Sequence, residues 1–248
     1  MSGSDTVAGV LERVTVTSYV TPLREGGSLP AVVEADNLGT YVLKFRGAGQ
    51  GPLVLVAEII CAELARRLGL RVPDLALAWL DGKIAASEPD QEIQELLSAS
   101  EGLNLAIDYL PGSAGFDPLG WTAEEEFASE LLWFDALTLN VDRTWRNPNL
   151  LVWHSRIWLI DHGAALYFHH DWSRADPAKP YDARNHVVRE RATRLAQAHE
   201  KLAPLVTADL LREVTANVPE EWFGARGADA YVDLLAQRAR LVPEVIKL

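Results

Sequence analysis

The chain has 248 residues, of which 48% are hydrophobic, and this is enough for one large domain or a domain of two lobes. Its formal net charge is −12, from 35 acidic and 23 basic residues. This balance argues against a nucleic-acid-binding surface, because neutralising many phosphates requires a basic face. It is compatible with a nucleotide ligand, which needs only one or two local cations.

The composition also bears on cellular location. The single cysteine, Cys61, lies in an apolar segment, so we interpret it as a small core residue and exclude a disulfide framework. The first residues lack a basic segment followed by an apolar one, so no signal peptide is expected. No apolar run approaches the roughly 18 residues that a membrane span requires. We therefore expect a cytoplasmic protein with no membrane partner.

The first 45 residues are rich in β-branched and aromatic side chains, which predicts antiparallel strands over residues 14–20, 31–35 and 40–45. The loop between the first two strands contains Gly26, Gly27 and Ser28. Because glycine has no side chain, backbone N–H groups there can approach a phosphate closely. The alternative is a flexible hairpin tip, since this loop is not a complete glycine-rich phosphate motif.

Lys44 is the polar residue of the third predicted strand, and alternation places it opposite Tyr41, Leu43 and Phe45. A strand lysine is usually a solvated edge residue. The functional alternative is a cation that contacts the α- and β-phosphates of a nucleotide and is held by a glutamate from a helix.

Residues 53–68 have the periodicity of a helix, and Gly69 is a typical stop. Glu58 lies in the apolar first half of this helix, where a lone carboxylate is costly to bury unless it is paired. Glu63 precedes two arginines and is interpreted as a surface charge. We therefore predict that Glu58 is the partner of Lys44, with Glu63 as the alternative.

Further elements are predicted from apolar runs and turn signals. These are strands over residues 75–80, 83–86 and 103–110, and helices over residues 90–99, 122–140, 187–202, 207–217 and 228–241. Thr122 and Glu125 form a capping-box pattern at the start of one helix. The neighbouring His169 and His170 are interpreted as part of an activation or substrate-binding loop rather than as a zinc site.

Residues 139–163 contain the strongest functional pattern, with Asp142, Asn147 five residues later, and Asp161 in an Asp-x-Gly sequence. Two apolar runs at residues 150–152 and 157–160 predict a β-hairpin between the carboxylates. A hairpin returns its ends to neighbouring positions, so the three side chains are expected to converge.

This arrangement resembles the catalytic loop of protein kinases. The resemblance implies that Asp142 accepts the proton of a substrate hydroxyl, while Asn147 and Asp161 bind Mg²⁺ against the phosphates of ATP. Asn149 is a rival to Asn147 as a metal ligand. The alternative is an ordinary surface turn, because Asp, Asn and Pro are common in loops.

Four blocks, in order, resemble the HipA-like kinases: YVLKF at residues 41–45, AEIICAELARRLGLRVPDLAL at 57–77, NVDRTWRN at 140–147 and LIDHG at 159–163. The third block also resembles the Asp-Arg-x-x-x-Asn loop of phosphoinositide kinases. It departs from the pattern Asp-Arg-His, because Thr144 occupies the histidine position. A toxin role, known for longer HipA proteins, does not carry over.

The resemblance implies an α+β, two-lobed, protein-kinase-like fold. Its N-lobe, residues 1–110, would hold an antiparallel sheet and one helix, and its C-lobe, residues 111–248, would be mostly helical. Backbone groups near Asp108 and Leu110 would meet the adenine edge of ATP.

The expected function is ATP- and Mg²⁺-dependent phosphoryl transfer to a hydroxyl, with a serine or threonine of a protein favoured over a small molecule. The alternatives are a nucleotide-binding pseudokinase that acts as an interaction module and a nucleotidyltransferase with the same fold.

Overall fold

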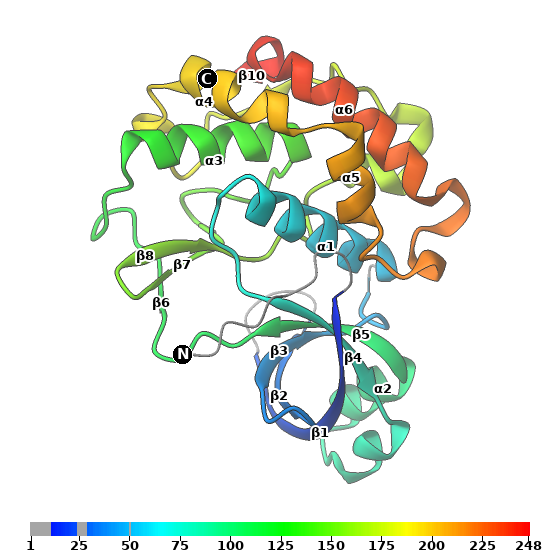
Figure 1. Cartoon of the computed structure of the whole chain (residues 1–248). Coiled ribbons are helices and arrows are strands. Elements are labelled where there is room, and N and C mark those ends of the chain that lie inside the picture. Colours follow the sequence, from blue (N-terminus) through cyan, green and yellow to red (C-terminus); the bar gives the residue numbers. More distant parts are fainter. Residues whose placement is uncertain (1–10, 24–28, 50) are drawn as a thin grey trace, which may run out of the picture.

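The computed structural model describes residues 11–23, 29–49 and 51–248 (Figure 1). The N-terminal half contains β1 (Glu12–Pro22), β2 (Ala31–Ala35), β3 (Thr40–Lys44), α1 (Pro52–Arg67), β4 (Leu75–Leu80), α2 (Gln91–Ala99) and β5 (Gly102–Asp108). The remainder contains β6 (Ala114–Gly115), α3 (Glu125–Thr138), β7 (Leu150–Trp153), β8 (Arg156–Leu159), β9 (Tyr181–Asp182), α4 (Leu195–Leu202), α5 (Ala208–Thr215), α6 (Gly227–Val245) and β10 (Ile246–Lys247).

The five long strands form a closed barrel in the order β1-β2-β3-β5-β4. Four of the pairings are antiparallel, as predicted for the N-lobe sheet, but β1 pairs with β4 in parallel and thereby closes the barrel. Alternate side chains fill the interior, among them Tyr41, Leu43 and Phe45 of the β3 region. Lys44 lies on the opposite face of β3, as the alternation predicts.

Helix α1 lies between the barrel and the helices of the C-terminal half (Figure 1). Its buried residues belong to one apolar core with α3, α5 and α6, so the helix is buried on nearly all sides. Cys61 is one of these core residues and is fully buried, as predicted. The two-lobed division follows from this arrangement, and we propose residue 110, just after β5, as the boundary between the lobes.

Several predicted elements differ in the structure. Residues 83–86 are not a strand, because Gly82–Ser87 form a 3-10 helix whose first turn is capped by the Asp81 side chain, which accepts from Lys83 N at 2.9 Å. The capping box of Thr122 does not form, since α3 begins at Glu125. The predicted helix over residues 187–202 is shorter, because α4 starts at Leu195 after a separate 3-10 turn.

The predicted hairpin is present, with β7 and β8 paired in the register Leu150↔Leu159 and Trp153↔Arg156. Its two-residue turn is formed by His154 and Ser155, which both have positive φ angles, of 47° and 57°. This is the turn geometry whose twist matches that of the flanking strands.

Asn104 provides a test of how the barrel is stabilised. It is fully buried on β5, and its amide donates to the carbonyls of Ser100 and Gly102 while its oxygen accepts from Arg46 N at 2.9 Å. Asn104→Ala removes three hydrogen bonds to the backbone, so we expect the free energy of unfolding to fall by about 2–4 kcal/mol. Urea denaturation at an unchanged m-value measures the loss. A change below about 0.5 kcal/mol would mean that this side chain does not organise the barrel.

Candidate active site

Three charged side chains, from β3, α1 and the segment after β8, meet between the lobes. The Lys44 ammonium group on β3 donates to Glu58 on α1 and to Asp161 Oδ1, the latter at 2.7 Å. Glu58 is 1% exposed and Lys44 8%, whereas half of the Asp161 side chain remains open to solvent. The structure therefore contains the predicted pair of Lys44 with Glu58 and also brings Asp161 to it.

The charges of this cluster stabilise one another against burial. Burial alone lowers the pKa of Lys44, but Glu58 and Asp161 outweigh it and the pKa is raised above its usual value of 10.5. Burial raises the pKa of Glu58, yet Lys44 and His162 outweigh this and the pKa lies well below 4.5.

These directions set the pH dependence of the pair. The contribution of Glu58 to stability is present above its unfolded pKa and is lost only as the pH falls through its much lower folded pKa. The contribution of Lys44 is present below its unfolded pKa and is lost as the pH rises through its higher folded pKa. Both groups therefore stay charged throughout the neutral range.

The second oxygen of Glu58 ties α1 to the segment after the hairpin. Glu58 Oε2 accepts from His162 N at 2.9 Å, and Gly163 lies so close to α1 that an added Cβ would be 2.6 Å from Val54 Cγ1. Glu63 does not compete for this position. It pairs with Arg66 at 3.3 Å and is only 8% exposed, so its interpretation as a surface charge is wrong.

Asp142 lies in the loop after α3 and is held by both nearby asparagines. Asn147 Nδ2 and Asn149 Nδ2 donate to Asp142 Oδ2 at 2.8 and 3.1 Å. Asn147 is exposed, whereas Asn149 is buried and its carbonyl accepts from Ile160 N at 3.1 Å. Asn149 is therefore hydrogen-bonded to Ile160, the residue directly before Asp161. The five-residue spacing that favours Asn147 does not predict this bond.

The donor set at this position fits a hard cation. Each asparagine uses its NH₂ group toward Asp142, and in the part of the chain that the structure describes neither amide oxygen accepts a hydrogen bond. Asp161 adds a half-exposed carboxylate. Mg²⁺ is usually held by one or two carboxylates together with waters and substrate phosphates, and these side-chain oxygens are of the kind that it binds. Among the described residues there is no cluster of three or more His, Cys, Asp or Glu side chains suited to a metal.

The predicted adenine-binding residues lie at the connection between the lobes. Asp108 N donates to the carbonyl of Asp74 at 2.8 Å, and Tyr109 N donates to the carbonyl of Thr40 at 3.0 Å. Burial and the charge of Asp74 raise the pKa of Asp108. Leu110 is buried. The predicted phosphate-loop residues Gly26, Gly27 and Ser28 lie outside the described residues.

Sequence reasoning missed a second buried carboxylate. Asp135 on α3 is fully buried and accepts from Arg143 Nε at 2.6 Å, and Arg143 is the residue after Asp142. Burial raises the pKa of Asp135, but Arg143 and His186 outweigh this and the pKa is lowered. The signal in the sequence is an acidic residue within the apolar run from Leu131 to Leu137. A carboxylate in such a run needs a partner, which is also the reason for selecting Glu58.

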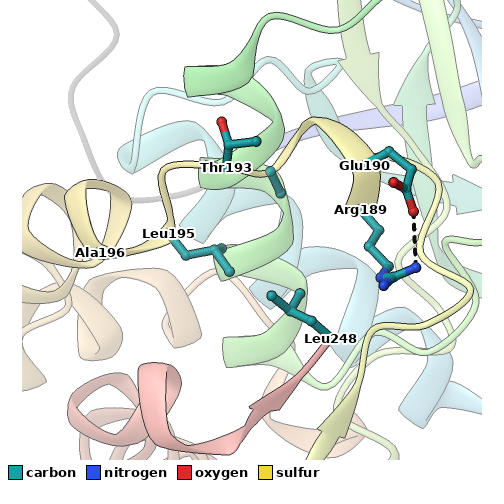
Figure 2. A pocket seen from close by; sticks show the side chains of 7 residues that line it. Arg189, Glu190, Thr193, Leu195, Ala196 and Leu248 are labelled. Atoms are coloured by element: carbon teal, nitrogen blue, oxygen red, sulfur yellow. Dashed lines mark hydrogen bonds and ion pairs between the residues drawn. The ribbon is translucent and has the colours of Figure 1, made fainter.

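A cavity of about 540 Å³ lies elsewhere, between the segment before α4 and the C-terminal residue (Figure 2). It is lined by Arg189, Glu190, Ala192, Thr193, Leu195, Ala196 and Leu248. Arg189 and Glu190 form an ion pair at 3.0 Å. None of the predicted site residues lines this cavity.

Solved structures with a similar fold are kinases. The Helicobacter pylori proinflammatory kinase CtkA matches with a TM-score of 0.52 at 13% identity, over 90% of this chain and 97% of that one. The Golgi casein kinase with Mn/ADP bound matches with a TM-score of 0.53 at 11% identity, over 96% of this chain and 73% of that one. The predicted protein-kinase-like, two-lobed α+β fold is thus confirmed.

The chain belongs to the HipA-like kinase family, because a family model of that description matches residues 16–241. The protein is therefore a kinase-type phosphotransferase, as the four sequence blocks predict. A search of curated proteins for relatives found no match. Within residues 11–23, 29–49 and 51–248, no helix combines the length and apolar character needed to cross a bilayer.

Gly163 provides a test of the charged cluster. Gly163→Ala forces a methyl group against Val54 and toward Glu58 Oε1, which would lie 3.3 Å away. We expect a loss of about 1–3 kcal/mol of stability together with weaker nucleotide binding. Val54→Ala should restore both in the double variant, because it removes the clashing methyl group.

Gly115→Ala is the matched control, since an added Cβ there has nothing within 4 Å. Thermal unfolding and nucleotide titration of the three variants are the measurements. If Gly163→Ala behaves like Gly115→Ala, close contact between α1 and this loop is not needed.

Proposed function

We propose that the protein transfers the γ-phosphoryl group of ATP to a hydroxyl acceptor with the help of Mg²⁺. The observation that carries the proposal is the convergence of Lys44, Glu58 and Asp161, together with Asp142 in the loop that leads into the same hairpin. A nucleotide and a divalent cation are present in the similar Golgi casein kinase structure with Mn/ADP bound, which supports the same ligand class.

Each residue has a separate task in this proposal. Lys44, oriented by Glu58, contacts the α- and β-phosphates, while Asp161 holds Mg²⁺. Asp108 and Leu110 offer backbone groups to the adenine, because residues two apart in an extended segment face the same side. Gly26, Gly27 and Ser28 would cover the phosphates.

Asp142 has the geometry of a proton acceptor. Its Oδ2 atom is occupied by the two asparagine amides, whereas its Oδ1 atom accepts no hydrogen bond from the residues that the structure describes. In the transfer step the acceptor oxygen loses its proton to Asp142 and bonds to the γ-phosphorus. The bond from that phosphorus to the bridging oxygen breaks, and ADP leaves with the electron pair. Catalysis comes mainly from positioning and charge neutralisation.

The surroundings of Asp142 favour a serine or threonine of a protein as the acceptor. Asp142 is half-buried at the surface, and Trp145, three residues later, is 56% exposed. The Arg146 guanidinium lies 4.6 Å from the centre of the Trp145 ring. An open, aromatic and cationic surface suits a polypeptide segment better than a small molecule, which is usually enclosed.

Asn147 and Asn149 are both candidates for the amide ligand of Mg²⁺, and we favour Asn149. Its backbone bond to Ile160 fixes it beside Asp161, and its burial limits its rotamers. Asn147 then acts mainly through its hydrogen bond to Asp142.

The two aspartates should behave differently when substituted. Asp161→Asn removes a charged oxygen ligand and should weaken Mg²⁺-dependent nucleotide binding. Asp142→Asn should leave nucleotide affinity nearly unchanged while turnover falls by about 10²- to 10⁴-fold. Titration calorimetry with Mg·ATP and a phosphoryl-transfer assay on both variants are the measurements. Equal loss of binding in both, or full turnover in Asp142→Asn, would contradict the assigned tasks.

The two asparagines can be separated with glycine substitutions, which tolerate the φ angle of 49° at Asn149. Both variants lose one hydrogen bond to Asp142, so each controls for the other. Asn149→Gly should weaken the Mg²⁺-dependent part of ADP binding by about tenfold or more, and Asn147→Gly should not. Calorimetry with and without Mg²⁺ gives this difference. The reverse order would assign the metal to Asn147.

A further inference from the structure

The carboxylate of Asp135 collects three hydrogen bonds inside the C-lobe. Arg143 Nε and His186 Nε2 contact its Oδ2 atom at 2.6 and 2.9 Å, and Asn140 Nδ2 donates to Oδ1 at 3.2 Å. Arg143 follows Asp142 in the chain, and Asn140 Oδ1 accepts from Asp142 N at 3.2 Å. Asp142 is therefore flanked on both sides by groups that are fixed to Asp135.

Residues 181–188, here called the supporting segment, hold the same loop from outside. Tyr181 OH donates to the carbonyl of Asn140 at 2.7 Å, and Val187 N donates to the carbonyl of Arg143 at 3.2 Å. His186 forms a β-bridge with Thr144. At its start the supporting segment is itself held by β10, which pairs with β9. Its contacts thus extend over residues 140–145, the part of the loop that carries Asp142.

The tautomer of His186 follows from its two bonds. Val188 N can only donate, so His186 Nδ1 must accept, at 3.3 Å. The proton then resides on Nε2 and is donated to Asp135. The His186 side chain is 1% exposed and lies beside a carboxylate that also accepts from Arg143.

We propose that His186 is a positioning residue for phosphoryl transfer. It acts through Asp135 and the supporting segment to hold Asp142 in its reactive place, without touching nucleotide or acceptor. This inference rests on the proposed function, because Asp142 is given its role there. It concerns turnover and not nucleotide affinity, since His186 contacts none of Lys44, Glu58 and Asp161 within the described part of the chain.

The variants His186→Leu and His186→Gln test this role. Leucine removes both hydrogen bonds, whereas glutamine keeps one donor and one acceptor on its amide. We expect His186→Leu to lower kcat by about 10²-fold, which is the effect of a small misplacement of a catalytic group. The KM for ATP should stay within about twofold, and His186→Gln should recover most of kcat. The assay is transfer of the γ-label of ATP to protein of a host lysate in the presence of Mg²⁺.

His169→Leu is the matched control, because His169 is also buried and loses one hydrogen bond, to Tyr231 OH at 3.1 Å. It should reduce stability without the selective fall in kcat. Tyr181→Phe supplies a second variant that keeps the ring in the core and removes only the bond to the loop. It should lower kcat in the same direction, with an unchanged KM for ATP.

Hydrogen exchange separates this inference from the proposed function. In His186→Leu the amides of Thr144, Trp145 and Val187 should exchange faster while those of α6 keep their protection. If the native protein transfers no γ-label to an acceptor, the proposed function fails and exchange alone decides the positioning role. Unchanged exchange at these amides, or a fall in kcat that His169→Leu reproduces and glutamine does not rescue, would overturn the inference.

Discussion

The active-site architecture depends on the buried ion pair of Lys44 and Glu58. Each charge is costly to bury alone, and removing one partner of such a pair typically costs about 3–5 kcal/mol because the other is left uncompensated. The pair joins a barrel strand to α1, and through Asp161 and His162 it also joins α1 to the hairpin of the other lobe. One electrostatic constraint therefore sets the relative positions of the elements that would contact the phosphates and the metal.

A second buried carboxylate sets the positions of the elements around Asp142 in a similar way. Asp135 gathers Arg143, Asn140 and His186, and so connects α3 and the supporting segment to the loop that carries Asp142. The two networks have different tasks. In the proposed mechanism the first organises the nucleotide and metal, and the second organises the residue that receives the proton. Preorganised charge is what phosphoryl transfer needs most from a protein, because little covalent chemistry is left for its side chains.

Local patterns made the pairing of Lys44 with Glu58, the hairpin, and the contact between Asp142 and Asn147 predictable. Glu58 was identified because a carboxylate in an apolar helix face demands a partner. The parallel β1–β4 pairing was not predictable, since it joins residues about 60 apart without a local signal. The same holds for His186, which lies 51 residues from Asp135. The preference for Asn149 also required the structure, because it depends on a backbone bond across the hairpin.

The most direct test of the account is the fate of the phosphates of ATP. The protein is incubated with Mg²⁺, a lysate of its own host, and ATP labelled at either the γ- or the α-phosphate. Kinase action predicts that label from the γ-position appears on serine or threonine of protein, with ADP as the other product, and that label from the α-position does not. Protein-bound α-label would establish nucleotidyl transfer. Nucleotide binding without transfer of either label would contradict the account and leave an interaction module.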